Sequence, residues 1–170
     1  MSILSHLNPA AVWVYFEEIC KIPRLSKNEE KIRRYLLDFA SANNLKAKED
    51  ETGNILITRE ASPGMEGSKT LVLQSHMDMV GEKNAGHPHN WTTDPIVPQL
   101  KGEWVTASGT TLGADDGIGI ASQMAILTDK DLVAGRIECL FTVDEESGMT
   151  GALNLDPGFF EGRTLINLDS

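Results

Sequence analysis

The stretch LVLQSHMD, residues 71–78, decides the fold, because an apolar run ends abruptly in a histidine and an aspartate. A short continuous apolar run predicts a strand that is buried on both faces of a sheet. Residues 136–143 are a second such run and lead into Asp-Glu-Glu, and residues 164–168 are a third and lead into Asp169. Residues 115–128, between the first two runs, have helical periodicity, which predicts a helix with Ile118, Ala121, Ala125 and Ile126 on its buried side. We therefore predict an α/β protein with a layered helix-sheet-helix core and a mostly parallel sheet.

Two helix-start signals stand in the first 30 residues. Asn8 before Pro9 is a typical helix cap followed by a first-turn proline. SKNE at residues 26–29 is a capping-box pattern, in which the serine and the glutamate bond backbone amides at the helix start. We expect a helix after each signal, and then a hairpin with strands near residues 46–49 and 55–58 around Gly53.

Residues 81–110 are rich in Gly, Pro, Asn and Thr, which predicts a long excursion over the surface. We expect His87 and His89 within it to be exposed loop histidines. Trp91 and Trp104 flank the same segment, and we expect both rings to anchor it by packing against the body of the protein.

The composition excludes several classes of function. There are 15 Lys and Arg against 25 Asp and Glu, for a net charge of −10, which counts against nucleic acid and anionic membranes as partners. The longest apolar run, residues 10–16, is too short to span a bilayer, and the first residues lack the basic start of a signal peptide. Cys20 and Cys139 lie in apolar segments, which predicts buried thiols in a reducing cytoplasm.

Acidic residues or a histidine follow all three predicted core strands. Because the carboxyl ends of neighbouring parallel strands meet at one sheet edge, we expect His76, Asp78, the carboxylates at 144–146 and Asp169 to converge. Clustered carboxylates repel one another, and bound cations are the simplest way to neutralise them. Each motif alone also suits an ordinary solvated turn, but its repetition after three strands favours a site.

The glycine-rich run GTTLGADDGIG at residues 109–119 leads into the predicted helix. It lacks the Lys-Ser or Lys-Thr of a phosphate-binding loop, and Asp115 and Asp116 occupy the helix start where a phosphate would lie. Either carboxylate can offer oxygens to a cation. For Asp116 an ordinary helix-capping role is equally well supported.

Four motifs together resemble those of the M20-type metallopeptidases, with the resemblance extending over the whole chain. They are SHMDMV at 75–80, GTTLGADDG at 109–117, DEESG at 144–148 and NLDS at 167–170. The resemblance implies that residues 1–170 are the N-terminal part of a catalytic domain, without the family's lid domain and later catalytic residues. The chain also stops directly after a predicted core strand, which suggests a longer protein.

The resemblance implies a metal-binding role for four residues. His76 and Asp169 would bind one zinc ion, Glu146 would bind a second, and Asp115 would bridge the two. Mixed imidazole and carboxylate ligands suit zinc, and also manganese or cobalt. The resemblance further implies a cis peptide bond after Asp115.

Two more residues would take part in the reaction that the resemblance implies. Glu145 corresponds to the general base, and Asp78 corresponds to the catalytic aspartate and can orient the imidazole of His76. The expected reaction is the hydrolysis of dipeptides, such as aminoacyl-histidine, by water that two divalent ions activate. This 170-residue chain alone is expected to be inactive.

Other interpretations share part of this pattern. A related tripeptidase or N-acyl amino-acid deacylase would have the same metal core. A non-catalytic acidic domain that binds calcium is the alternative from another class, and His76 argues against it because calcium prefers oxygen ligands. The preferred interpretation is a cytoplasmic dipeptidase whose partner is a dipeptide, with a homodimer open as the assembly of the whole protein.

Overall fold

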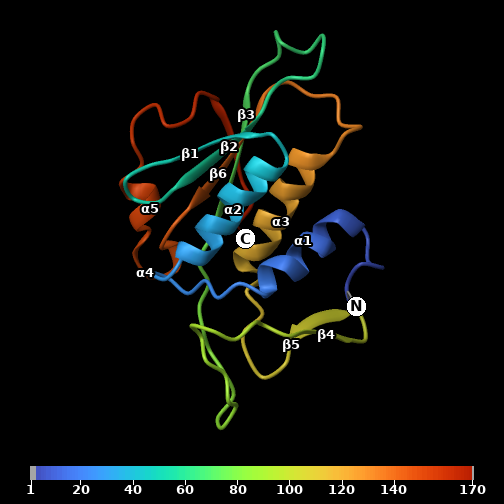
Figure 1. Ribbon diagram of the computed structural model, residues 1–170, viewed down its shortest axis with the longest axis vertical. Coiled ribbons are helices and arrows are strands. Elements are labelled where there is room, and N and C mark those ends of the chain that lie inside the picture. Colours follow the sequence, from blue (N-terminus) through green and yellow to red (C-terminus); the bar gives the residue numbers. More distant parts are fainter. Residues whose placement is uncertain (1–2, 170) are drawn as a thin grey trace.

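The computed structural model describes residues 3–169, and its centre is a five-stranded sheet with helices packed against it (Figure 1). The helices are α1 (Ala10–Cys20), α2 (Glu30–Ala42), α3 (Ala114–Thr128), α4 (Glu145–Gly148) and α5 (Thr150–Leu153). The strands are β1 (Lys46–Glu49), β2 (Ile55–Arg59), β3 (Leu71–His76), β4 (Pro98–Lys101), β5 (Trp104–Ala107), β6 (Ile137–Thr142) and β7 (Thr164–Asn167). Within the described residues, no helix is long and apolar enough to cross a membrane.

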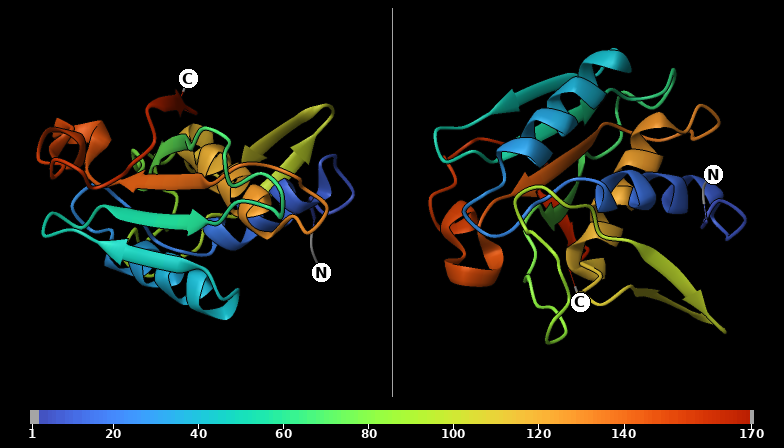
Figure 2. Two further views of the ribbon diagram at one scale, coloured as in Figure 1. Left: turned by 90° about the horizontal axis from the view of Figure 1, so that it is seen from above. Right: turned by 60° about the horizontal axis from the view of Figure 1, so that its bottom comes forward.

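The sheet is mixed, with the strand order β1-β2-β6-β3-β7. β3 runs parallel to both β6 and β7, so the predicted parallel core is confirmed for the three strands that lead into the motifs. The hairpin of β1 and β2 extends the sheet in antiparallel fashion, and β1 and β7 form its opposite edges (Figure 2). His76 pairs with Thr142, the last residue of β6, so the carboxyl ends of β3 and β6 lie side by side.

Alternate residues of the strands pack on opposite faces of the sheet, as the period of a strand requires. One face packs against α1, α2 and α3 through a large apolar cluster that includes Phe16, Leu36, Ile57, Met124 and Phe141. The other face packs Leu56, Val72 and Leu140 against Phe159 from the segment before β7. Burial of this apolar surface is the main source of stability. Cys20 and Cys139 are free and buried, as predicted.

Both predicted helix caps are wrong. α1 begins after Pro9 with no side-chain cap, and the Asn8–Pro9 peptide bond is cis. The hydroxyl of Ser26 donates a hydrogen bond to the carboxylate of Asp78. The carboxylate of Glu29 accepts hydrogen bonds from backbone N–H groups, which include the amide of Asp144. The SKNE pattern therefore connects the start of α2 with the strand ends, because its polar groups find buried partners there.

The segment 81–110 contains an element that was not predicted. β4 and β5 pair as an antiparallel hairpin that stands apart from the main sheet (Figures 1 and 2). Trp91 packs against the core as expected, but Trp104 is 75% exposed and anchors nothing. His87 and His89 are not exposed: their rings stack at 6.3 Å, and His89 is buried.

Two details of the predicted core are also wrong. β7 is exposed along its whole length, because among the described strands it pairs only with β3 at the edge of the sheet. Ala121 lies on the buried side of α3 as predicted, but the other large side chains on that side are Ile120, Met124 and Leu127. Ile118, Ala125 and Ile126 are only half-buried.

Candidate metal centre

His76 ends β3, and carboxylates from three other segments surround its ring. Its Nε2 atom lies 2.9 Å from Oδ1 of Asp115 and 4.0 Å from Oδ2 of Asp169. Side-chain ligand atoms of His76, Asp115 and Glu146 lie within 4.8 Å of one another, and so do those of His76, Glu145 and Asp169. The structure thus brings these five predicted residues together at the carboxyl ends of β3, β6 and β7, with the two glutamates in different groups.

Asp78 lies on the opposite side of the imidazole, where it is completely buried. Its Oδ1 atom and its backbone oxygen lie 3.3 Å and 3.1 Å from Nδ1 of His76. The same carboxylate accepts hydrogen bonds from the amides of Glu145 (2.9 Å) and Glu146 (3.1 Å) and from the hydroxyl of Ser26 (2.7 Å). Asp78 therefore fixes both the ring and the glutamate-bearing backbone, and it leaves Nε2 facing the other carboxylates.

The local environment shifts the pKa values of His76 and Asp78 in opposite directions. Burial by itself lowers the pKa of His76, but hydrogen bonds to Asp78 and Asp115 outweigh it and raise that pKa to about 9. Burial raises the pKa of Asp78, but bonds from His76, Ser26 and the two glutamate amides outweigh it and lower that pKa to about 2. Without a metal, the ring and Asp78 therefore form an ion pair at neutral pH.

Asp115 and Asp116 take different positions at the start of α3. Their peptide bond is cis, as the resemblance implied, and both residues have non-helical backbone angles. The side chain of Asp115 is 53% exposed and faces the ring of His76. Asp116 is buried, where it accepts hydrogen bonds from the amides of His76 (3.2 Å) and Gly119 (3.1 Å). Of the two interpretations of Asp116, the geometry supports helix capping.

A second cluster of carboxylates lies beneath the site and was not predicted. Glu29, Asp78 and Asp144 are all buried, with oxygens within 4.8 Å of one another. Glu29 accepts the amides of residues 27 and 144 at 3.0 Å, and Asp144 accepts hydroxyl groups from Ser147 and Thr150. Because donors already satisfy these oxygens, the cluster is a hydrogen-bonded support for residues 144–146. The only sequence feature that pointed to this cluster was the SKNE segment at residues 26–29, and its polar residues are also typical of a helix start.

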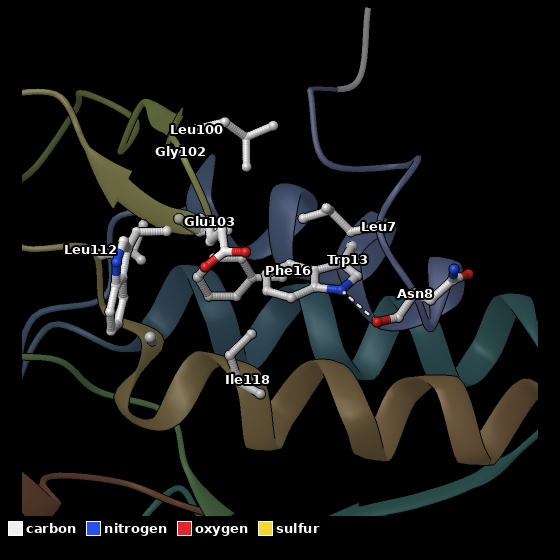
Figure 3. A pocket seen from close by; sticks show the side chains of 12 residues that line it. Leu7, Asn8, Trp13, Phe16, Leu100, Gly102, Glu103, Leu112 and Ile118 are labelled. Carbon is white, nitrogen blue, oxygen red and sulfur yellow. Dashed lines mark hydrogen bonds between the residues drawn. The ribbon is translucent and has the colours of Figure 1, made fainter.

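An apolar pocket of about 380 Å³ lies between α1, α3 and the hairpin of β4 and β5 (Figure 3). Trp13 and Phe16 of α1, Ile118 of α3 and Leu100 of β4 line it. Asp115 and Glu146 line a second, more open pocket together with residues 111–114, and Glu145 and Asp169 line a third. The carboxylates that converge on His76 therefore line these two pockets and not the apolar one.

The donor set fits a transition-metal ion. One imidazole nitrogen and several carboxylate oxygens within 4.8 Å of one another are ligands that suit zinc, manganese or cobalt. Burial and the nearby charge of Asp115 raise the pKa of Glu146, and a cation at this position would relieve that repulsion. An α/β sheet with such a donor set at its carboxyl edge defines a candidate metal-dependent hydrolase.

Comparisons with known proteins agree with this class. Residues 72–166 match the family described as Peptidase family M20/M25/M40. The cytosol non-specific dipeptidase of Escherichia coli strain K12 is 47% identical over 170 residues, which are 100% of this chain and 35% of that protein. The chain belongs to peptidase family M20/M25/M40.

Solved structures show the same fold. The crystal structure of aminoacylhistidine dipeptidase from Vibrio alginolyticus matches with a TM-score of 0.97 and 50% identity, over 99% of this chain and 34% of that one. A tripeptidase from Staphylococcus aureus matches with a TM-score of 0.80 and 26% identity, over 96% of this chain and 44% of that one. The chain thus spans about a third of the length of its more similar relatives.

Proposed function

We propose that the whole protein is a metallo-dipeptidase that cleaves the peptide bond of dipeptides such as aminoacyl-histidine. One observation carries this proposal: an imidazole and four carboxylates meet at the carboxyl edge of the sheet, with His76 common to both groups. The similarity to a non-specific dipeptidase and to an aminoacylhistidine dipeptidase supports the choice of substrate.

In this proposal His76 and Asp169 would hold one divalent ion, Glu146 would hold a second, and Asp115 would help to hold both. The 2.9 Å approach of His76 to Asp115 and the 4.0 Å approach to Asp169 support the first ion, and the position of Glu146 within 4.8 Å of Asp115 supports an ion that these two carboxylates share. Zinc is the preferred ion, and manganese or cobalt would suit the same ligands. When bound, such ions polarise a peptide carbonyl and lower the pKa of water.

Glu145 is the proposed general base. Its amide donates to buried Asp78, which fixes the start of α4, while its half-buried carboxylate remains at the open site near Asp169. It would accept a proton from the attacking water and deliver it to the leaving amine. Asp78 would keep His76 oriented by occupying the Nδ1 side of the ring.

We infer that residues 1–170 form the N-terminal part of the catalytic domain, and that this chain alone does not turn over dipeptides. The partial coverage of the relatives supports this division. A cytoplasmic location is proposed from the printed name of the Escherichia coli relative, and a homodimer remains a prediction for the whole protein.

A tripeptidase is the second candidate, because a tripeptidase from Staphylococcus aureus matches with a TM-score of 0.80 and 26% identity. A calcium-binding domain fits less well, since His76 belongs to both groups of ligand atoms. The test is to assay the whole protein, supplied with Zn²⁺, on dipeptides, tripeptides and N-acyl amino acids. Faster cleavage of dipeptides supports the proposal. Preference for tripeptides or acyl amino acids would replace it, and absence of any cleavage would refute it.

A further inference from the structure

Arg24 is a buried cation that lies next to the candidate metal centre. It belongs to the connection between α1 and α2, and only 3% of its surface is exposed. Its backbone oxygen accepts the amide of Met79 at 3.1 Å, so the main chain beside it is attached to the segment that follows β3. Among the described residues, no carboxylate oxygen lies within the 4.0 Å of an ion pair with its guanidinium.

The guanidinium donates instead to three backbone carbonyls. Nη1 donates to the oxygens of Met77 (3.0 Å) and Asp78 (2.9 Å), and Nη2 donates to the oxygen of Gly113 (2.5 Å). The first two carbonyls immediately follow His76, and the third comes two residues before Asp115. One planar side chain thus joins the two backbone segments whose side chains meet at 2.9 Å in the site.

The surroundings leave no spare room for this group. Gly113 has a φ of 69°, and a Cβ atom built there would lie 2.7 Å from Nη2. A Cβ atom on Gly117 would also lie 2.7 Å from Nη2, and 3.0 Å from the ring of Phe16. The absence of side chains at both glycines is therefore required for the guanidinium to reach its carbonyls.

We propose that Arg24 is a positioning residue: by bonding the backbone on either side, it sets the distance between His76 and Asp115, and so sets the affinity of the site for metal. The inference rests on the proposed function for its metal and catalytic consequences. Its geometric part, the spacing of the two side chains, does not depend on that function. A lysine would keep the charge but could not present the same planar fork of donors to three carbonyls.

The test compares Arg24→Lys with Arg34→Lys, an exposed arginine on α2 that serves as the matched control. Zn²⁺ alone is titrated into each folded variant of the whole protein. Arg24→Lys should bind Zn²⁺ roughly 10- to 100-fold more weakly, as changes behind metal ligands usually do, and the control should be unchanged. In the whole protein, excess Zn²⁺ should restore part of the activity lost by Arg24→Lys. Unchanged affinity in Arg24→Lys would overturn the proposal.

Two further measurements apply if Arg24→Lys does not fold or if the protein binds no Zn²⁺. If Arg24→Lys does not fold, Gly117→Ala adds a methyl group against Nη2 while keeping every hydrogen-bonding group, and it should weaken Zn²⁺ binding in the same direction. If the unaltered whole protein binds no Zn²⁺, the proposed function fails. In that case the NMR signals of the ring nitrogens of His76, measured without metal, test the positioning role of Arg24. Arg24→Lys should shift these signals, and unchanged signals would refute the role.

Discussion

Glu145 and Glu146 are adjacent in sequence, yet their carboxylates belong to different groups of ligand atoms. We expect Glu145→Gln in the whole protein to lower kcat by about 10²–10⁴-fold, because an amide keeps the shape but cannot accept a proton. Its metal content should stay nearly unchanged. Glu146→Gln, the matched variant, should instead lose metal together with activity. Elemental analysis and steady-state kinetics of both variants would check this, and the reverse outcome would exchange the two roles.

The pKa of His76 predicts how the stability of the metal-free chain depends on pH. This pKa is raised to about 9, above the usual value of about 6.5, so protonation favours the folded state. The stabilisation is fully present below pH about 6.5 and is lost as the pH rises through about 9.

Urea unfolding in the presence of a chelator would measure this dependence. The free energy of unfolding of the wild-type chain minus that of His76→Asn should fall between pH about 6.5 and about 9.5. A difference that stays constant over this range would show that His76 has no raised pKa in the folded state.

At the scale of elements, the SKNE segment connects α2 with the site. Ser26 donates to the buried carboxylate of Asp78 at 2.7 Å, and hydrogen bonds to a charged group contribute about 1.5–3 kcal/mol. We expect Ser26→Ala to destabilise the chain by about that amount, and Ser26→Ala with Asp78→Asn to be clearly non-additive.

A double-mutant cycle measured by chemical denaturation would check the coupling, with exposed Ser41→Ala as a control that leaves stability unchanged. Additive effects of Ser26→Ala and Asp78→Asn would show that the hydroxyl of Ser26 does not stabilise the carboxylate of Asp78.

The core strands and the site could be predicted from sequence because their signal is local. An apolar run that ends in His76, or in residues 144–146, marks both a buried strand and its functional end. β7 has the same pattern but is exposed, since apolar composition does not reveal which strand lies at an edge. The buried supports Arg24 and Glu29 could not be predicted, because the backbone groups that connect them to the site lie 53 or more residues away in the sequence.

At the scale of the whole molecule, this chain contains only part of the proposed active site. We expect the purified 170-residue chain to have no measurable dipeptidase activity, even with added Zn²⁺ or Mn²⁺. By the resemblance, one ligand of the second ion and the lid that positions the substrate lie outside it. An assay across a panel of dipeptides and metal concentrations would check this. Turnover that His76→Ala abolishes would show that the chain contains a complete site.

We propose that His76, Asp115, Glu146 and Asp169 together hold two metal ions. Anomalous diffraction at the zinc edge, from crystals of the whole protein grown with Zn²⁺, tests this proposal most directly. We expect two anomalous peaks, one beside His76 and Asp169 and one beside Glu146, with Asp115 between them at coordination distances of about 2.0–2.2 Å. Fully occupied zinc elsewhere, with no peak within reach of His76 and Asp115, would contradict it.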